Sequence, residues 1–151
     1  MLLLLSSDIC RHIILTRDPV ALEVLENWSS EGHEIMLSAI SYAELVAGAL
    51  QTADKIKHMA LVKAFCERLD AIVPWDDAAV DQYTVIQMKA LQAGPAPNMN
   101  NAMLAAHAIS LDARLLCQNR KPFQGIEQLK LLELSDLGGA GESAQDNRDS
   151  A

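Results

Sequence analysis

Residues 35–48 read IMLSAISYAELVAG, a short apolar segment that runs directly into the start of a helix. Residues 35–37 predict a buried β-strand, because a short apolar run bounded by polar residues is typical of one. The sequence from about Ala39 to Leu50 predicts the helix. A buried strand followed at once by a helix is the repeating unit of an α/β fold.

The same alternation continues along the chain. Further strands are predicted at residues 1–5, 71–75, 114–117 and 129–134. Helices are predicted at 9–15, from Asp18-Pro19 to about Gly32, at 54–69, from Asp76-Asp77 to the breaker at 94–97, and at 98–111. Strands alternating with helices predict an α/β fold in which a central, mostly parallel sheet is flanked by helices.

Composition predicts one globular domain. The chain has 151 residues and half of them are hydrophobic, enough to build a sizeable core. We expect a single domain over residues 1–137. Residues 138–151 are small, polar and without periodicity, and predict a disordered tail.

Charge and cysteine content indicate which binding partners and which cellular compartment the sequence favours. The formal net charge of −8 disfavours nonspecific nucleic-acid binding, although Arg114, Arg120 and Lys121 could form a local basic patch or be ordinary solvated charges. Three widely spaced cysteines predict neither a disulfide framework nor a zinc site, and favour a reducing, cytoplasmic location. The opening MLLLL is too short for a signal peptide or a membrane span, so no membrane association is expected.

Polar residues occur at or just beyond four predicted strand ends or helix starts. These clusters are Ser6-Ser7-Asp8, Ser41 to Glu44, Asn100-Asn101 and Gln118-Asn119. Because ligands bind at the carboxyl ends of parallel strands, the four clusters are expected to converge on one candidate site.

Each of these residues also has a purely structural interpretation. Ser41 and Glu44 fit the capping box S-x-x-E before an apolar run, and Asp8 could be the N-cap of the first helix. The asparagines after Pro97 could be ordinary capping residues. His107 lies among alanines, which favours a packed helix histidine over a ligand or a base.

Four motifs, in order, resemble those of one protein family. They are LSSDIC at Leu5 to Cys10, the stretch from Leu37 to Gly48, PNMNNAMLAAHA at Pro97 to Ala108, and Cys117 to Asn119 with Phe123 four residues later. Together they resemble the motifs of PIN-domain nucleases and, within those, of the VapC toxins of toxin–antitoxin modules. The resemblance covers about Met1 to Leu134.

The resemblance implies a PIN-like three-layer fold and an Mg²⁺- or Mn²⁺-dependent endoribonuclease. The metal positions would be Ser6, Asp8, Glu44, Asn101 and Asn119, with Glu44 and Asp8 as the catalytic carboxylates. The implied partners are an antitoxin protein that crosses the site, RNA (with tRNA as the substrate guess) and a second copy in a homodimer.

The chain departs from the family pattern at its acidic positions. Ser6 stands where the family has its first catalytic Asp, and Asn101 stands at the third acidic position, while Glu44 is retained. The fourth position, which is Asp or Asn among relatives, is Asn119. Asp8 lies two residues beyond the lost Asp. Since Mg²⁺ prefers carboxylate oxygens, we expect weak or absent metal binding and impaired catalysis.

Three alternatives remain open from the sequence. The protein cleaves RNA with Glu44 and Asp8 around one metal, or it is a non-catalytic PIN fold that binds an antitoxin or RNA. The third is an unrelated α/β domain in which Glu44 is only a capping residue.

Overall fold

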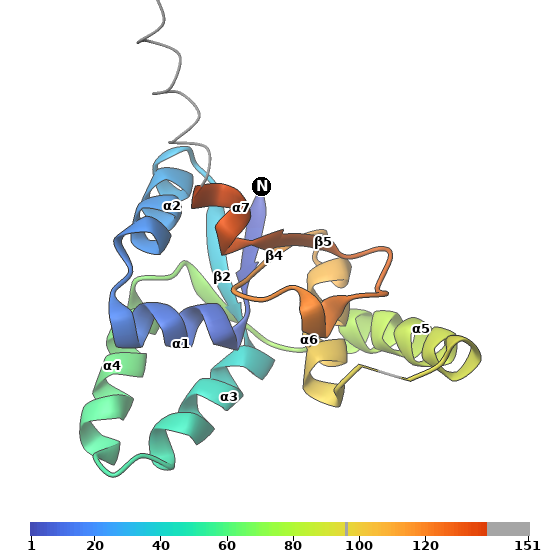
Figure 1. Ribbon diagram of the computed structural model, residues 1–151, viewed down its shortest axis with the longest axis horizontal. Coiled ribbons are helices and arrows are strands. Elements are labelled where there is room, and N and C mark those ends of the chain that lie inside the picture. Colours follow the sequence, from blue (N-terminus) through green and yellow to red (C-terminus); the bar gives the residue numbers. More distant parts are fainter. Residues whose placement is uncertain (96, 139–151) are drawn as a thin grey trace, which may run out of the picture.

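The computed structural model describes residues 1–95 and 97–138, and its centre is a five-stranded sheet. The strands are β1 (Leu2–Leu5), β2 (Glu34–Ser38), β3 (Ala71–Val73), β4 (Arg114–Cys117) and β5 (Lys130–Glu133). They are ordered β3-β2-β1-β4-β5, and all four pairings are parallel (Figure 1). The predicted mostly parallel sheet is therefore entirely parallel in the described residues.

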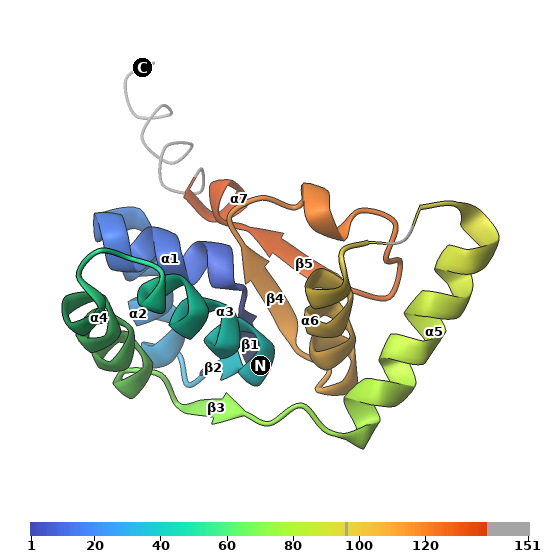
Figure 2. The same ribbon diagram turned by 90° about the horizontal axis from the view of Figure 1, so that it is seen from below.

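Helices cover both faces of this sheet. The larger group is α1 (Ser7–Thr16), α2 (Pro19–Ser30), α3 (Ala39–Leu50) and α4 (Lys55–Glu67), and it packs on one face. The other group is α5 (Asp77–Ala93) and α6 (Met99–Ser110), packed on the opposite face. Figure 2 shows the two groups on either side of the strands. The predicted three-layer α/β architecture is confirmed.

The leucines of β1 explain why the sheet lies between two helical layers. Leu3 and Leu5 pack in the core beneath α1–α4, whereas Leu4 packs in the core beneath α5 and α6. None of the three has measurable solvent exposure. Successive side chains of a strand point to opposite faces, so a continuous leucine run needs an apolar layer on each side.

Short polar side chains set the starts of most helices. Asp18 accepts from the backbone N–H of Val20 at 2.9 Å, and Asp76 accepts from that of Ala79 at 3.1 Å. Asn98 does the same for Asn100 at 2.9 Å. These caps satisfy amides that have no partner inside the helix, which is why the predicted starts of α2, α5 and α6 agree with the structure.

Two capping interpretations are wrong. Helix α1 begins at Ser7 with Ser6 in the N-cap position, so Asp8 lies within the first turn and is not the N-cap. Helix α3 is capped by Ser38, whose hydroxyl accepts from the N–H of Ile40 at 3.1 Å. Ser41 therefore lies inside that helix, and its hydroxyl donates to the carbonyl oxygen of Leu5 at 3.2 Å.

The carboxyl-terminal part differs from the prediction in one element. The strand predicted at 129–134 ends at Glu133, because Leu134 begins a short helix, α7 (Leu134–Gly138), whose leucines pack against the core beneath α1–α4. Of the predicted tail, Gly138 is the last residue of α7, and residues 139–151 lie outside the described residues. The domain boundary at 137 stays a prediction.

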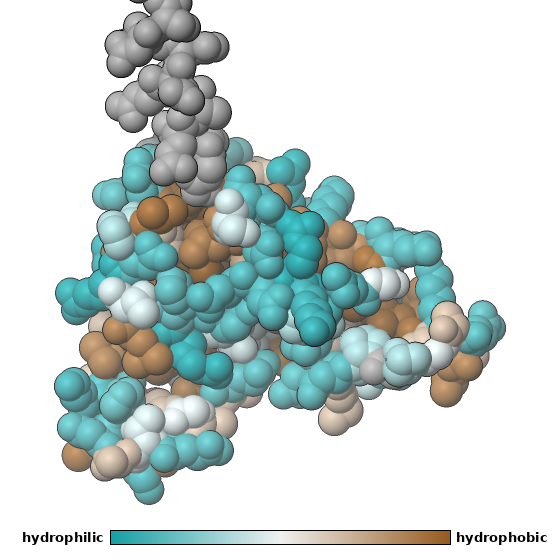
Figure 3. All heavy atoms as spheres, in the orientation of Figure 1, coloured by the Kyte–Doolittle hydropathy of each residue, from teal (hydrophilic) through white to brown (hydrophobic). Residues whose placement is uncertain are grey.

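The surface offers no membrane-spanning element in the part of the chain that the structure describes, since none of its helices is both long and apolar enough. Figure 3 shows a largely hydrophilic face with separate apolar patches beside α2 and α7, beside α1 and α4, and at the far end of α5.

Replacing Leu4 with Ala tests the central strand. We expect the free energy of unfolding to fall by about 2–5 kcal/mol, because a fully buried leucine is truncated between two layers. Urea unfolding measures the loss. Leu91, which is 80% exposed on α5, is the matched control, and its change to Ala should alter stability by no more than about 0.5 kcal/mol. Equal losses in both variants would contradict this account of the core.

Candidate functional site

The candidate site lies where the order of the strands reverses. The chain passes from β1 to β2 on one side of the sheet, while β4 lies on the other side of β1. The N–H of Ser6 donates to the carbonyl oxygen of Leu116 at 3.0 Å, so the ends of β1 and β4 remain in contact beyond the ladder. In parallel α/β sheets, ligands bind in the crevice at such a switch point, outside the carboxyl ends of the strands.

Asp8 is the most heavily hydrogen-bonded side chain of this edge. Its Oδ1 accepts from the N–H of Ile9 at 2.7 Å and from the hydroxyl of Ser6. Its Oδ2 accepts from the N–H groups of Gln118 and Asn119, both at 3.3 Å. The carboxylate therefore joins the start of α1 to the loop that follows β4.

Glu44 reaches the same edge from the second turn of α3. Its Oε2 accepts from the hydroxyl of Ser7 at 3.2 Å, and the side chain is half-buried. With the bond from Ser41 to Leu5, this contact holds α3 against the end of β1. Glu44 is thus positioned by tertiary contacts rather than by a helix cap.

The neutral residues at the predicted metal positions have separate roles. Ser6 is buried, at 2% exposure, and uses its hydroxyl to donate to Asp8. Asn119 accepts from the N–H of Lys121 at 3.0 Å through its side-chain oxygen. Asn101 lies half-buried in the first turn of α6, and no hydrogen bond joins its side chain to another described residue.

Three of the four predicted clusters are therefore connected. Hydrogen bonds link the cluster after β1 to Glu44 and to Gln118-Asn119. Helix α6, which carries Asn100 and Asn101, contacts α3. No hydrogen bond among the described residues joins these two asparagines to the other three clusters.

His12 also belongs to this edge, although it is not among the residues predicted from the sequence. Its Nδ1 faces the side-chain amide nitrogen of Gln118 at 3.1 Å, and its Nε2 faces Oδ2 of Asp18 at 2.8 Å. The side-chain nitrogen of Gln118 can only donate, so Nδ1 of His12 is the acceptor. The ring proton of His12 is then on Nε2, which donates to Asp18. This hydrogen bond lowers the pKa of Asp18. The spacing in the sequence could have indicated it. His12 follows Asp8 by four residues, and residues four apart share one face of a helix.

His107 of α6 is fully buried, as its alanine-rich surroundings indicate. Its Nδ1 lies 2.8 Å from the hydroxyl of Ser38, which already accepts from Ile40 and so has its proton free for the imidazole. The Nε2 then bears the ring proton and has no partner among the described residues. Burial lowers the pKa of His107, outweighing the charge of Asp76.

The residues present do not fit a resident Mg²⁺ or Mn²⁺. Each oxygen of Asp8 already takes two donors, the hydroxyl of Ser6 is itself a donor, and the oxygen of Asn119 is used within its own loop. Within residues 1–95 and 97–138, no three His, Cys, Asp or Glu side chains are grouped so that they could hold a metal ion. Glu44 is left as a single carboxylate with one oxygen unused by these bonds.

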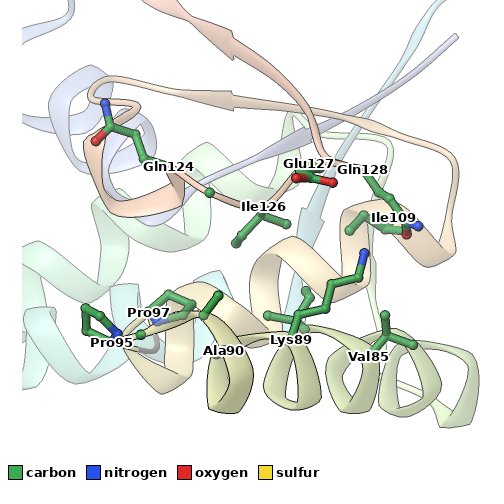
Figure 4. A pocket seen from close by; sticks show the side chains of 14 residues that line it. Val85, Lys89, Ala90, Pro95, Pro97, Ile109, Gln124, Ile126, Glu127 and Gln128 are labelled. Atoms are coloured by element: carbon green, nitrogen blue, oxygen red, sulfur yellow. The ribbon is translucent and has the colours of Figure 1, made fainter.

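A separate pocket of about 200 Å³ lies away from this edge, between α5 and the segment 124–128 that follows the 3₁₀ helix η1 (Lys121–Phe123). Figure 4 shows Lys89 and Ala90 of α5 facing Ile126 across it. Its lining is mostly apolar and includes none of the predicted site residues. The predicted catalytic and metal-binding residues therefore lie outside this pocket.

The chain is similar to proteins of one family along most of its length. Residues 9–127 match the family described as PIN domain. Ribonuclease VapC1 of Haemophilus influenzae is 26% identical over 130 residues, which cover 86% of this chain and 96% of that relative. Ribonuclease VapC2 of Rickettsia felis is 27% identical over 131 residues, covering 87% and 96%.

A solved structure shares the fold closely. The crystal structure of VapBC2 from Rickettsia felis bound to a DNA fragment from their promoter contains a chain with a TM-score of 0.83 and 26% identity. The match covers 88% of this chain and 98% of that one. The similarity in fold therefore extends over most of the chain.

The buried histidine predicts a loss of stability in mild acid. The unfolded chain binds the proton of His107 with a pKa near 6.5, whereas burial lowers the pKa in the folded state. The free energy of unfolding should therefore fall as the pH drops below about 6.5, until the folded-state pKa is passed. Urea unfolding between pH 7.5 and 5 measures this.

The His107→Gln variant should lose most of that dependence, whereas His58→Gln, at a half-buried position of α4, should keep it. Carboxyl groups with lowered pKa values, such as Asp18, add their own loss only nearer pH 4. An unchanged pH profile in His107→Gln would show that another group carries the effect.

Proposed function

Because the chain belongs to the PIN-domain family, we propose that it is a VapC-type protein of a toxin–antitoxin module in which metal-dependent RNA cleavage is impaired. Similarity over nearly the whole chain to proteins named ribonuclease VapC supports the type. The engagement of Asp8 by four donors is the observation that carries the impairment.

The proposal includes the partners that VapC-type proteins suggest. The similar Rickettsia felis chain was solved as a VapBC2 complex, which supports a VapB-type antitoxin as the protein partner here. RNA, with tRNA as the first class to test, is the substrate of any remaining activity. A homodimer and a cytoplasmic location complete the proposal, and the three free cysteines are consistent with that location.

Charge explains why the substitutions matter. Two unit charges about 4 Å apart attract by roughly 4 kcal/mol at an effective dielectric constant near 20. Serine and asparagine at positions 6 and 101 remove two such attractions for a cation. Since about 1.4 kcal/mol is a tenfold change in affinity, metal binding should weaken by orders of magnitude.

The predicted basic patch gives little support for RNA binding. The guanidinium of Arg120 lies 3.4 Å from Oε2 of Glu133 and also pairs with Asp136. Two carboxylates therefore surround one arginine beside the candidate site. Phosphate binding depends on uncompensated cations, so this part of the edge is poorly suited to it.

Retained catalysis with Glu44 and Asp8 around one metal is the competing possibility. It requires Asp8 to give up hydrogen bonds from two elements before it can offer lone pairs to a cation. A non-catalytic protein that binds its antitoxin or RNA requires no such change, and the observed contacts favour it.

Calorimetric titration with Mn²⁺ and Mg²⁺ tests the impairment. The wild type should show no binding below millimolar metal, and divalent metal should leave its melting temperature nearly unchanged. The Glu44→Gln variant should behave alike, because there is no bound ion to lose. Metal binding by the wild type that disappears in Glu44→Gln, together with RNA cleavage abolished by EDTA, would refute impaired catalysis.

Restoring the acidic positions is the complementary test. The double variant Ser6→Asp, Asn101→Asp should be less stable without metal, because added carboxylates repel Asp8 and Glu44, and should be stabilised by Mn²⁺. Thermal unfolding with and without Mn²⁺ measures both effects. Ser6→Asn in the otherwise unchanged chain matches the size change without the charge and should show no response to metal. A double variant indifferent to Mn²⁺ would contradict the proposed origin of the loss.

A further inference from the structure

The loop after β4 presents consecutive N–H groups toward α1. The amides of Gln118 and Asn119 both point at one oxygen of Asp8, at 3.3 Å. Successive backbone amides that converge in this way form a nest, a concave arrangement that binds anions. Here the anion inside the nest is a carboxylate of the same chain.

We propose that Asp8 is an internal anionic ligand, whose carboxylate fills this nest and holds the ends of β1 and β4 together without a metal ion. The proposal concerns the architecture of the site and does not depend on whether the protein cleaves RNA.

The hydrogen-bond capacity of the carboxylate supports this role. An ionised carboxylate accepts at about four lone-pair positions. Asp8 receives four donors, two on each oxygen, from Ser6, Ile9, Gln118 and Asn119. Bonds to a charged acceptor are stronger than bonds between neutral groups. The bonds from Ser6 and Ile9 are partly buried, whereas those from the amides of Gln118 and Asn119 are longer and exposed. A cation would have to compete with all of them.

The loop is held from its other side by a second carboxylate. The N–H of Arg120 donates to Oε1 of Glu133 at 3.0 Å, and the N–H of Lys121 donates to the side chain of Asn119 at 3.0 Å. Four successive amides, from Gln118 to Lys121, are thus accepted by side-chain oxygens. Asp8 from α1 and Glu133 from β5 together define the conformation of the loop.

A nest that accepts a carboxylate has the same chemistry as one that accepts a phosphate group. Both ligands offer anionic oxygens to N–H donors. Removing the Asp8 carboxylate should therefore leave donors that a small anion can satisfy. A metal-ligand role for Asp8 makes the opposite prediction, because its removal would then abolish a response to cations.

The test compares Asp8→Ala with Asp77→Ala. Asp77 lies in the first turn of α5 and accepts from the N–H of the next residue, Ala78, at 3.1 Å, as Asp8 accepts from Ile9. Among the described residues it makes no bond to a second element, so it matches the local role of Asp8 and lacks the bridge. Thermal unfolding is measured for both variants and the wild type in chloride, with inorganic phosphate at equal ionic strength, and with Mn²⁺.

We expect Asp8→Ala to melt at least about 5 °C below the wild type, since charged hydrogen bonds between two elements are lost. Inorganic phosphate should recover part of that difference in Asp8→Ala and should change neither the wild type nor Asp77→Ala. Mn²⁺ should affect none of the three proteins.

A milder variant keeps the test valid if Asp8→Ala does not fold. In Asp8→Asn, amide hydrogen exchange at Gln118 and Asn119 should accelerate by at least tenfold, while exchange in β1 stays unchanged. Unaltered exchange at both amides would overturn the proposal.

Three further results would also overturn it. The first is equal melting temperatures for Asp8→Ala and Asp77→Ala. The second is no response of Asp8→Ala to phosphate, and the third is stabilisation of the wild type by Mn²⁺ that is lost in Asp8→Ala. Stabilisation by Mn²⁺ that persists in Asp8→Ala and is lost in Glu44→Gln would instead refute impaired catalysis and leave the role of Asp8 standing.

Discussion

The burial of β1 on both faces and along both edges is the constraint on which the other elements depend. Its leucines face two separate cores, and its backbone pairs with β2 on one side and β4 on the other. A parallel strand in this position requires crossover helices on each face. The same arrangement forces β2 and β4 to end beside β1, which brings residues more than one hundred positions apart to one edge of the sheet.

That edge holds two carboxylates close to one end of the sheet through hydrogen bonds alone. Clustered carboxylates repel one another unless a positive ion lies among them. In this chain the cluster contains Asp8 and Glu44, and each takes hydrogen bonds from neutral donors. These donors offset the negative charge of the two carboxylates. Under the proposed function, the lone pairs of Asp8 that accept from amides and a hydroxyl are not free to bind a cation.

Sequence patterns predict this structure most accurately where interactions between neighbouring residues decide the outcome. Asp18-Pro19 starts α2 because an acidic cap and a proline in the first turn act within three residues. The capping-box interpretation of Ser41 and Glu44 failed because Ser38 offers an equally good cap three residues earlier, and the end of β2 in the sheet decides between them. Ser41 is then free to bond to β1, a partner that no local pattern indicates.

The sequence by itself determined the alternation of strands and helices, the parallel sheet, and the polar positions at the strand ends, since these follow from hydrophobic period and turn chemistry over short segments. Only the tertiary structure decided what the polar residues do. Asp8 could have been a cap, a metal ligand or a bridge between elements. Its role depends on the amides of Gln118 and Asn119, which lie 110 and 111 residues away in the sequence. Hydrogen bonds are short-ranged and directional, so their partners are known only once the sheet has placed both ends of the chain side by side.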